Sequence, residues 1–174
     1  MTVIIVEGES DRVALETLSR RMGVALPTIV TVGGASGARR AISELPDTSV
    51  IGLVDANERA QFERVIERVF VCDPDLEGEL IRALGVDAVE AVIAAQGELA
   101  SFRRLQKQPA QRGRPVEAQL ARFFGGRSGN KPRYARLLAS AVPLNRMPEP
   151  LAELIRAATS QARPAQAFRA HADP

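Results

Sequence analysis

The chain has 174 residues, of which 45% are hydrophobic and 25% are charged, a balance typical of a globular domain with its own core. No apolar run approaches the ~20 residues of a membrane-spanning helix, and no charged-then-apolar leader precedes the first predicted strand, so we expect a cytoplasmic protein with no membrane partner. One cysteine, Cys72, and one histidine, His171, argue against a disulfide framework, a zinc site and a Ser-His-Asp triad.

The first predicted strand leads directly into acidic residues. Val3–Val6 is a short apolar run typical of a buried strand, and Glu7 and Gly8 follow it. Apolar residues then recur at helical spacing, which predicts a helix from about Ser10. Open α/β sheets bind ligands at the carboxyl ends of their strands, so Glu7 and Asp11 could converge there. The alternative is structural: Ser10 or Asp11 caps the helix, and Glu7 is solvated.

Two further strands are predicted in the next part of the chain. Thr28–Val32 leads through a glycine-rich turn to a helix over Ala38–Leu45. The turn lacks the lysine and the spacing of a P-loop, so we predict no ATP site there. Val50–Val54 runs into Asp55, and apolar spacing then predicts a helix over Ala60–Arg68.

A fourth predicted strand, Val69–Cys72, ends in the densest acidic cluster, and a helix over Leu76–Leu84 follows it. The carboxylates of this cluster are Asp73, Asp75, Glu77 and Glu79. The alternation of strands and helices favours a mostly parallel four-stranded α/β sheet flanked by helices. Three strands ending in carboxylates would bring like charges to one edge, where they repel each other unless a cation joins them. Oxygen ligands favour Mg²⁺ or Mn²⁺.

Strand signals then stop, and we expect a helical C-terminal extension. Its predicted helices are Ala88–Gln96, Glu98–Gln106, Val116–Phe124, Arg133–Ala141 and Leu151–Ala158. Two loops rich in proline or glycine, Gln108–Pro115 and Gly125–Pro132, carry Arg112, Arg114 and Arg127.

Charge is distributed unevenly along the chain. Residues 1–99 hold 9 Arg and no Lys against 17 Asp and Glu, whereas residues 100–174 hold 14 Lys and Arg against 4 Asp and Glu. An acidic half that could hold metal and a basic half that could hold phosphate suit an enzyme acting on nucleic acid. The alternative is that arginine only solvates helix faces. We divide the chain into an α/β core (1–97), a helical extension packed on the core (98–158) and a disordered tail (159–174).

Several of these stretches resemble the Toprim nuclease domain of OLD-family (overcoming lysogenisation defect) endonucleases. The similar stretches are E-G-E-S-D-R-V-A-L from Glu7 to Leu15, the glycines Gly33 and Gly34, D-P-D-L-E-G-E-L-I-R-A-L-G from Asp73 to Gly85, and G-N-K-P-R-Y-A from Gly129 to Ala135. Asp55-Ala56-Asn57 lies where Toprim domains usually have Asp-x-Asp. The resemblance covers residues 2–141 and implies a Toprim-like fold.

The resemblance also implies a function: an endonuclease that hydrolyses phosphodiester bonds in DNA, or in RNA, with two Mg²⁺ or Mn²⁺ ions. Glu7 and Asp11 would help to hold one ion, with Glu7 essential for catalysis. The residues that would hold or bridge to the other ion are Asp55, Asp75 and Glu77. Asp73 and Glu79 are weaker candidates, and Glu79 could instead face solvent.

Lys131 matches a family lysine near the scissile phosphate, which predicts a catalytic role; the alternative is a solvated loop lysine. The basic loops predict that Arg112, Arg114 and Arg127 contact phosphates. Two departures from the family matter. Asn57 replaces an acid and would weaken one metal site. The ATPase domain normally fused in front of this domain is absent, so the chain could act alone, act with a separate ATPase, or be inactive.

Two other classes of function remain open. A non-catalytic nucleic-acid-binding or assembly module on the same scaffold would keep the basic half and need no metal. The second class is a different reaction on a Toprim domain, either primer synthesis or topoisomerisation. A primase should bring nucleotide-binding and zinc elements, which the sequence lacks. A topoisomerase would need a nucleophilic tyrosine, and the single tyrosine, Tyr134, lies in a helical stripe that favours core packing.

Overall fold

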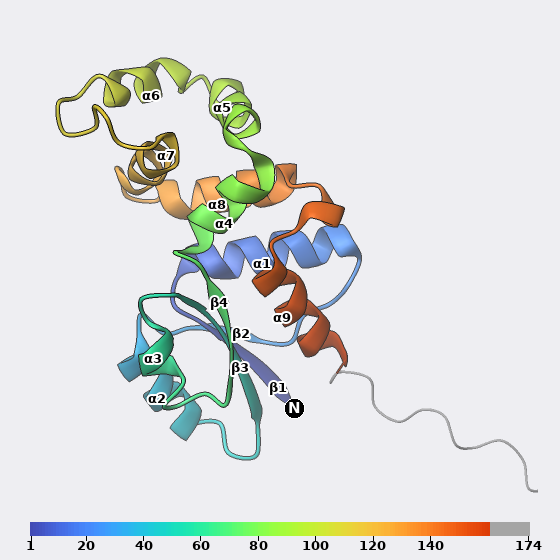
Figure 1. Cartoon of the computed structure of the whole chain (residues 1–174). Coiled ribbons are helices and arrows are strands. Elements are labelled where there is room, and N and C mark those ends of the chain that lie inside the picture. The colour runs from blue at the N-terminus through green and yellow to red at the C-terminus, as the bar shows by residue number, and fades with distance from the viewer. Residues whose placement is uncertain (161–174) are drawn as a thin grey trace, which may run out of the picture.

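The computed structural model describes residues 1–160 and contains a four-stranded sheet (Figure 1). Its strands are β1 Thr2–Val6, β2 Ile29–Thr31, β3 Ser49–Asp55 and β4 Arg68–Cys72, in the order β2-β1-β3-β4. Every pairing is parallel, so the predicted mostly parallel α/β sheet is confirmed. Because Val6 pairs with Leu53 and Asp55 pairs with Cys72, the carboxyl ends of β1, β3 and β4 lie side by side.

The helices cover most of the remaining described residues. They are α1 Glu9–Met22, α2 Ala35–Ser43, α3 Arg59–Phe62, α4 Leu76–Leu84, α5 Val86–Ala95, α6 Leu99–Gln106, α7 Val116–Gly125, α8 Asn130–Ala141 and α9 Glu149–Ser160, with a short 3-10 helix η1 at Leu144–Arg146.

Helix α3 differs most from its prediction, because it ends at Phe62 and does not run on to Arg68. Phe62 and Ile66 are both buried, and the amides of Val65 and Ile66 both bond to the carbonyl of Phe62. The chain therefore forms a buried turn after α3, and β4 begins at Arg68. The helical spacing of the apolar residues was real, but it belongs to a buried turn.

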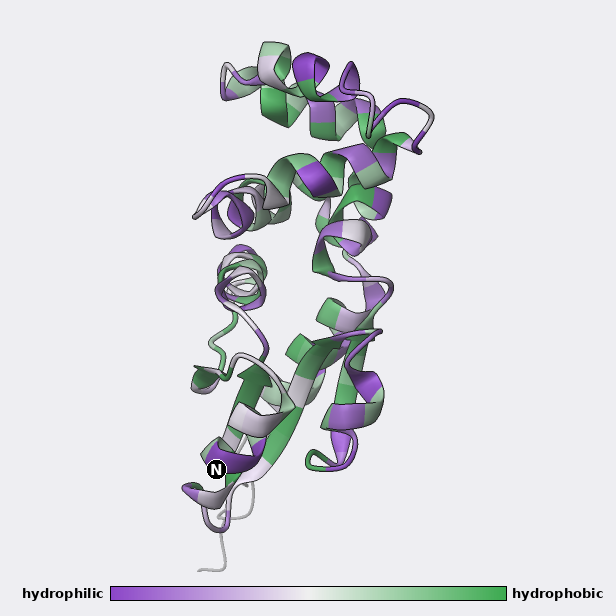
Figure 2. Cartoon of the chain, turned by 90° about the vertical axis from the view of Figure 1, so that its left-hand side faces the viewer, coloured by the Kyte–Doolittle hydropathy of each residue, from purple (hydrophilic) through white to green (hydrophobic). Residues whose placement is uncertain are grey.

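Alternating strand residues face two separate hydrophobic clusters. Val3 and Ile5 pack toward α2 and α3, whereas Ile4 and Val6 pack toward α1 and α9. Figure 1 shows α2 and α3 on one face of the sheet and α1 and α9 on the other. Figure 2 shows that the strands are largely hydrophobic, whereas most helices mix hydrophobic and hydrophilic residues. This pattern is expected of a parallel sheet covered on both faces.

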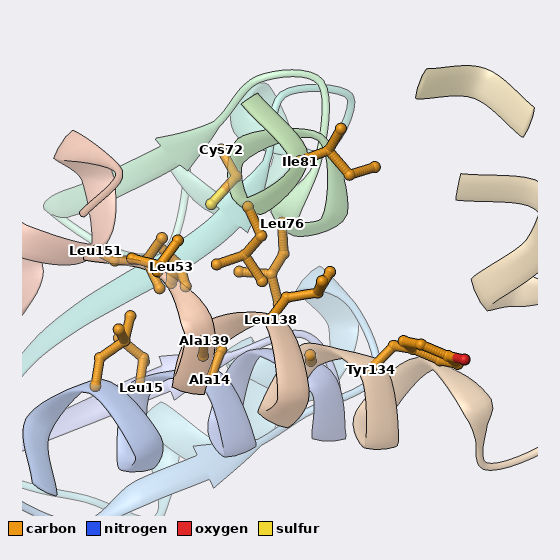
Figure 3. Close-up of a cluster of buried hydrophobic side chains, with 14 of the residues drawn as sticks. Ala14, Leu15, Leu53, Cys72, Leu76, Ile81, Tyr134, Leu138, Ala139 and Leu151 are labelled. Carbon is orange, nitrogen blue, oxygen red and sulfur yellow. The ribbon is translucent and has the colours of Figure 1, made fainter. Parts of the chain in front are cut away.

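The C-terminal helices return to the N-terminal half of the chain. Helix α8 packs along α1, and α9 packs on β3 and β4. Leu15 of α1, Leu53 of β3, Leu138 of α8 and Leu151 of α9 belong to one buried cluster (Figure 3). Helices α5, α6 and α7 form an arch beyond α8 (Figure 1). This packing brings the start of α8 close to the acidic ends of the strands.

Among residues 1–160, no helix is both long and apolar enough to cross a membrane. Helix α9 continues through Thr159 and Ser160, which the sequence assigned to the tail. The rest of the tail, predicted to be disordered, lies outside the described residues.

Candidate functional site

The turn between β1 and α1 positions the first two predicted metal ligands. Gly8 is the N-cap of α1, and its amide donates a hydrogen bond of 2.9 Å to Asp11 Oδ2. Asp11 therefore does help to cap the helix, as the structural alternative proposed. Burial raises the pKa of Asp11 to about 7, with further contributions from the charges of Glu77 and Glu7. A cap alone does not require two other carboxylates beside it.

Asp55 connects the ends of β3 and β4. It accepts a hydrogen bond of 3.3 Å from the amide of Leu76 at the start of α4. Burial raises the pKa of Asp55 to about 7, and four neighbouring carboxylates raise it further. Those four are Asp11, Asp75, Glu7 and Glu77. All five carboxylates predicted as metal ligands are therefore brought to one edge of the sheet.

Helix α4 presents the remaining two of these ligands in its first turn. Asp75 is the N-cap, and its Oδ1 accepts a hydrogen bond of 2.7 Å from the amide of Gly78. Glu77 is only 4% exposed, and its Oε1 is buried without a hydrogen-bond partner. Burial raises the pKa of Glu77, although the charge of Lys131 opposes this change.

Lys131 is the cation of this site. Its Nζ lies 3.5 Å from Glu77 Oε1, an ion-pair distance that is too long for a good hydrogen bond. Burial by itself lowers the pKa of Lys131, but the charges of Glu77, Asp75 and Asp55 outweigh burial and raise it. The sequence placed Lys131 in a loop, which is wrong: α8 begins at Asn130, so Lys131 lies in its first turn. The helix directs the lysine toward α4.

Asp73 and Glu79 have different structural roles from the five predicted metal ligands. Glu79 is buried and not on a solvent face; its carboxylate accepts a hydrogen bond of 3.1 Å from the amide of Asp73 and pairs with Arg82 at 2.9 Å. Asp73 is exposed. Cys72 is buried beside the site, where burial and the nearby carboxylates raise the pKa of its thiol, so the thiol stays protonated.

Sequence reasoning missed one acidic residue of the site. Asn57, aligned to the second acid of Asp-x-Asp, is exposed, whereas Glu58 is half-buried. Burial raises the pKa of Glu58, and contact with the carboxylate of Glu7 raises it further. Glu58 Oε2 is buried without a hydrogen-bond partner. The only sign of Glu58 in the sequence was its position in the turn after β3. The Asp-x-Asp motif indicated residue 57 instead.

The donor chemistry of this edge fits a hard divalent cation. In the part of the chain that the structure describes, no three ligating side chains are already arranged to hold one ion. Glu58 Oε2 is nevertheless buried without a hydrogen-bond partner, and Glu77 Oε1 has only its 3.5 Å ion pair with Lys131. Clustered carboxylates with unsatisfied oxygens are stabilised when a cation joins them, and all-oxygen ligands suit Mg²⁺ or Mn²⁺.

An arginine-lined cavity also borders the start of α8. It has a volume of about 280 Å³ and is lined by residues of α6, α7 and the turn before α8, among them Arg104, Arg122, Arg127 and Asn130. None of these three arginines forms an ion pair with any residue of 1–160. The sequence selected Arg127 but missed Arg104 and Arg122, which resemble solvated residues of helix faces.

The other two predicted phosphate contacts lie outside this cavity. Arg112 and Arg114 are exposed in the turns between α6 and α7, and Arg112 Nε donates a hydrogen bond of 3.0 Å to the carbonyl of Lys107. Tyr134 is fully buried, and its hydroxyl donates a hydrogen bond of 2.6 Å to Glu98. The expected packing role of Tyr134 therefore agrees with its position.

No protein-family model matches this chain, and no curated protein matches its sequence. Solved structures do match its fold. The C-terminal region of the Burkholderia pseudomallei OLD protein is 16% identical with a TM-score of 0.65, and the match covers 93% of this chain and 98% of that one. The C-terminal region of the Xanthomonas campestris pv. campestris OLD protein is 22% identical with a TM-score of 0.61, covering 92% and 96%. The fold expected from the sequence resemblance is thereby confirmed.

Proposed function

We propose that this chain, which shares its fold with the C-terminal regions of OLD proteins, is a metal-dependent nuclease of the Toprim type that hydrolyses phosphodiester bonds in DNA. One observation carries the proposal: five carboxylates gather where three strands end, and a lysine from a distant helix pairs with one of them, Glu77. The pKa values of Asp11, Asp55 and Glu77 are raised, and perturbed carboxylates beside a cation are common at catalytic sites. A structural ion pair would need only one of those carboxylates.

The proposed ligands are Glu7, Asp11, Asp55, Asp75 and Glu77. Divalent ions bound there would activate water and stabilise the attacking and leaving oxygens. Lys131 would hold a non-bridging phosphate oxygen, because an ammonium is a compact point charge suited to a crowded site. The arginine-lined cavity would hold a neighbouring phosphate of the same strand and so orient the scissile bond. A separate ATPase subunit, if one is needed, would act on this domain from outside.

The test is incubation of the purified protein with supercoiled plasmid in Mg²⁺ or Mn²⁺, followed by gel analysis of nicked and linear products. We expect cleavage that stops when EDTA is added. Glu7→Gln, purified in the same way, should be inactive, which excludes a contaminating nuclease. DNA binding without cleavage in either metal would instead support the alternative, a non-catalytic nucleic-acid-binding module.

A further inference from the structure

The turn that follows β3 holds Glu58 in a defined orientation. The amide of Glu58 bonds to the carbonyl of Asp55 at 3.0 Å, and the amide of Ala56 bonds to the carbonyl of Cys72 at 2.9 Å. These bonds tie the turn to itself and to the end of β4. In this turn Asn57 is exposed, whereas Glu58 is half-buried with its carboxylate beside that of Glu7, the residue that follows β1.

Glu58 and Glu7 form a carboxylate pair that lacks compensating charge. Neither residue forms an ion pair within residues 1–160, whereas Glu77 already has Lys131. Glu58 Oε2 is buried and accepts no hydrogen bond. The turn at Gly34 also lies close: a Cβ atom built there would be 4.0 Å from Glu58 Oε1. A buried acceptor without a donor is costly, and two adjacent carboxylates repel each other.

We propose that Glu58, and not position 57, supplies the second acid of the motif after β3, and that Glu58 and Glu7 together bind one divalent cation. This inference rests on the proposed function and adds a ligand to its metal site. The buried unpaired oxygen and the missing positive charge are what a metal ion would satisfy. On this basis, the asparagine at position 57 does not weaken the metal site, because the carboxylate of Glu58 supplies the ligand that the motif would otherwise place at position 57.

The test is a titration of the metal-free protein with Mn²⁺. Calorimetry measures the heat of binding, and the electron paramagnetic resonance signal of free Mn²⁺ measures how much metal stays unbound. Glu58→Gln keeps the shape of the side chain and removes its charge; Asn57→Asp is the matched variant at the adjacent, exposed position. We expect Glu58→Gln to weaken Mn²⁺ binding at least about tenfold or to remove one bound ion, and Asn57→Asp to bind as the parent does. Unchanged binding by Glu58→Gln, or tighter binding by Asn57→Asp, would overturn the proposal.

Thermal unfolding separates a ligand from a purely structural residue. In EDTA, Glu58→Gln should melt at the same temperature as the parent or higher, because a repulsive charge has been removed. In Mn²⁺, its melting temperature should rise less than that of the parent. A lower melting temperature in EDTA with an unchanged Mn²⁺ effect would assign Glu58 a structural role. If the parent protein binds no Mn²⁺ at all, the proposed function itself fails. If the parent binds Mn²⁺ and Glu58→Gln binds it equally well, this inference alone fails.

Discussion

At the scale of single residues, Lys131 is the cation closest to the carboxylates. Its Nζ lies 3.5 Å from Glu77, at the position where we propose a phosphate oxygen binds. We predict that Lys131→Ala lowers kcat about 100-fold and leaves the affinity for DNA and Mn²⁺ nearly unchanged. An interaction realised mainly in the transition state has this effect on turnover.

The chain offers a matched control for this measurement. Lys107 is the other lysine of the sequence, and it is exposed at the end of α6. Lys107→Ala should cleave plasmid DNA at the parental rate at saturating metal and DNA. Equal cleavage rates for the two lysine variants would exclude a catalytic role for Lys131.

Asp11 and Asp55 make the stability of the metal-free protein depend on pH. Burial raises the pKa of each from 3.8 to about 7, so the folded state binds these protons more tightly than the unfolded state. The stabilisation is fully present below the unfolded pKa and is lost as the pH rises through the folded pKa. In EDTA, we predict a free energy of unfolding about 2 to 4 kcal/mol lower at about pH 8 than at about pH 5.

Urea unfolding of the parent and of Asp11→Asn at both pH values checks this prediction. Asparagine cannot titrate, so the variant should lose less stability between the two pH values than the parent. The same protons compete with metal, so Mn²⁺ affinity should rise over this pH range. A parent whose metal-free stability is flat or increases toward alkaline pH would contradict the assignment.

At the scale of elements, Gly37 of α2 lies against the backbone that leads from β2 into the helix. A Cβ atom at this position would lie 2.0 Å from the carbonyl oxygen of Val32, just after β2. Backbone cannot yield as a flexible side chain can, so α2 would have to move away from the sheet. We predict that Gly37→Ala lowers the free energy of unfolding by about 2 kcal/mol, despite the better helix propensity of alanine.

Gly125, the last residue of α7, provides the comparison. A Cβ atom there would lie 3.7 Å from Lys131 Cε, an ordinary van der Waals distance. Gly125→Ala should therefore have the parental stability or slightly more. If urea denaturation gives Gly37→Ala the same midpoint as Gly125→Ala, then position 37 does not lie against the carbonyl of Val32.

At the scale of the whole molecule, the acidic site and the arginine-lined cavity both border the start of α8, the first through Lys131 and the second through Asn130. We predict that the triple variant Arg104→Ala, Arg122→Ala, Arg127→Ala binds duplex DNA much more weakly. The plot of log affinity against log salt should become less steep, by up to about 3 in slope. Each phosphate contact that is lost removes the release of about one counterion on binding.

Fluorescence anisotropy with labelled duplex over a range of KCl concentrations measures both quantities. The double variant Arg112→Ala, Arg114→Ala removes nearly as much charge from the exposed turns. We expect the double variant to lose less affinity than the triple variant, because its arginines do not share a cavity. An equal loss in both would mean that net charge, and not the cavity, determines binding.

The sequence by itself determined the strands, the parallel sheet and the acids that follow each strand. These follow from local spacing: short apolar runs, helical periodicity and the turn residues between them. The five proposed metal ligands lie within or next to such local motifs, so their convergence could be inferred once the sheet was taken to be parallel. Lys131 and Arg127 were also selected from sequence, but without their surroundings.

Only the tertiary structure decided which side chains face one another. The inward position of Glu58 depends on a turn anchored to β4, and the motif indicated Asn57 instead. The pairing of Lys131 with Glu77 and the cavity shared by Arg104 and Arg122 depend on packing between helices distant in sequence. Local patterns carry no information on such contacts, because side-chain direction at helix ends and turns is set by the segments that pack against them.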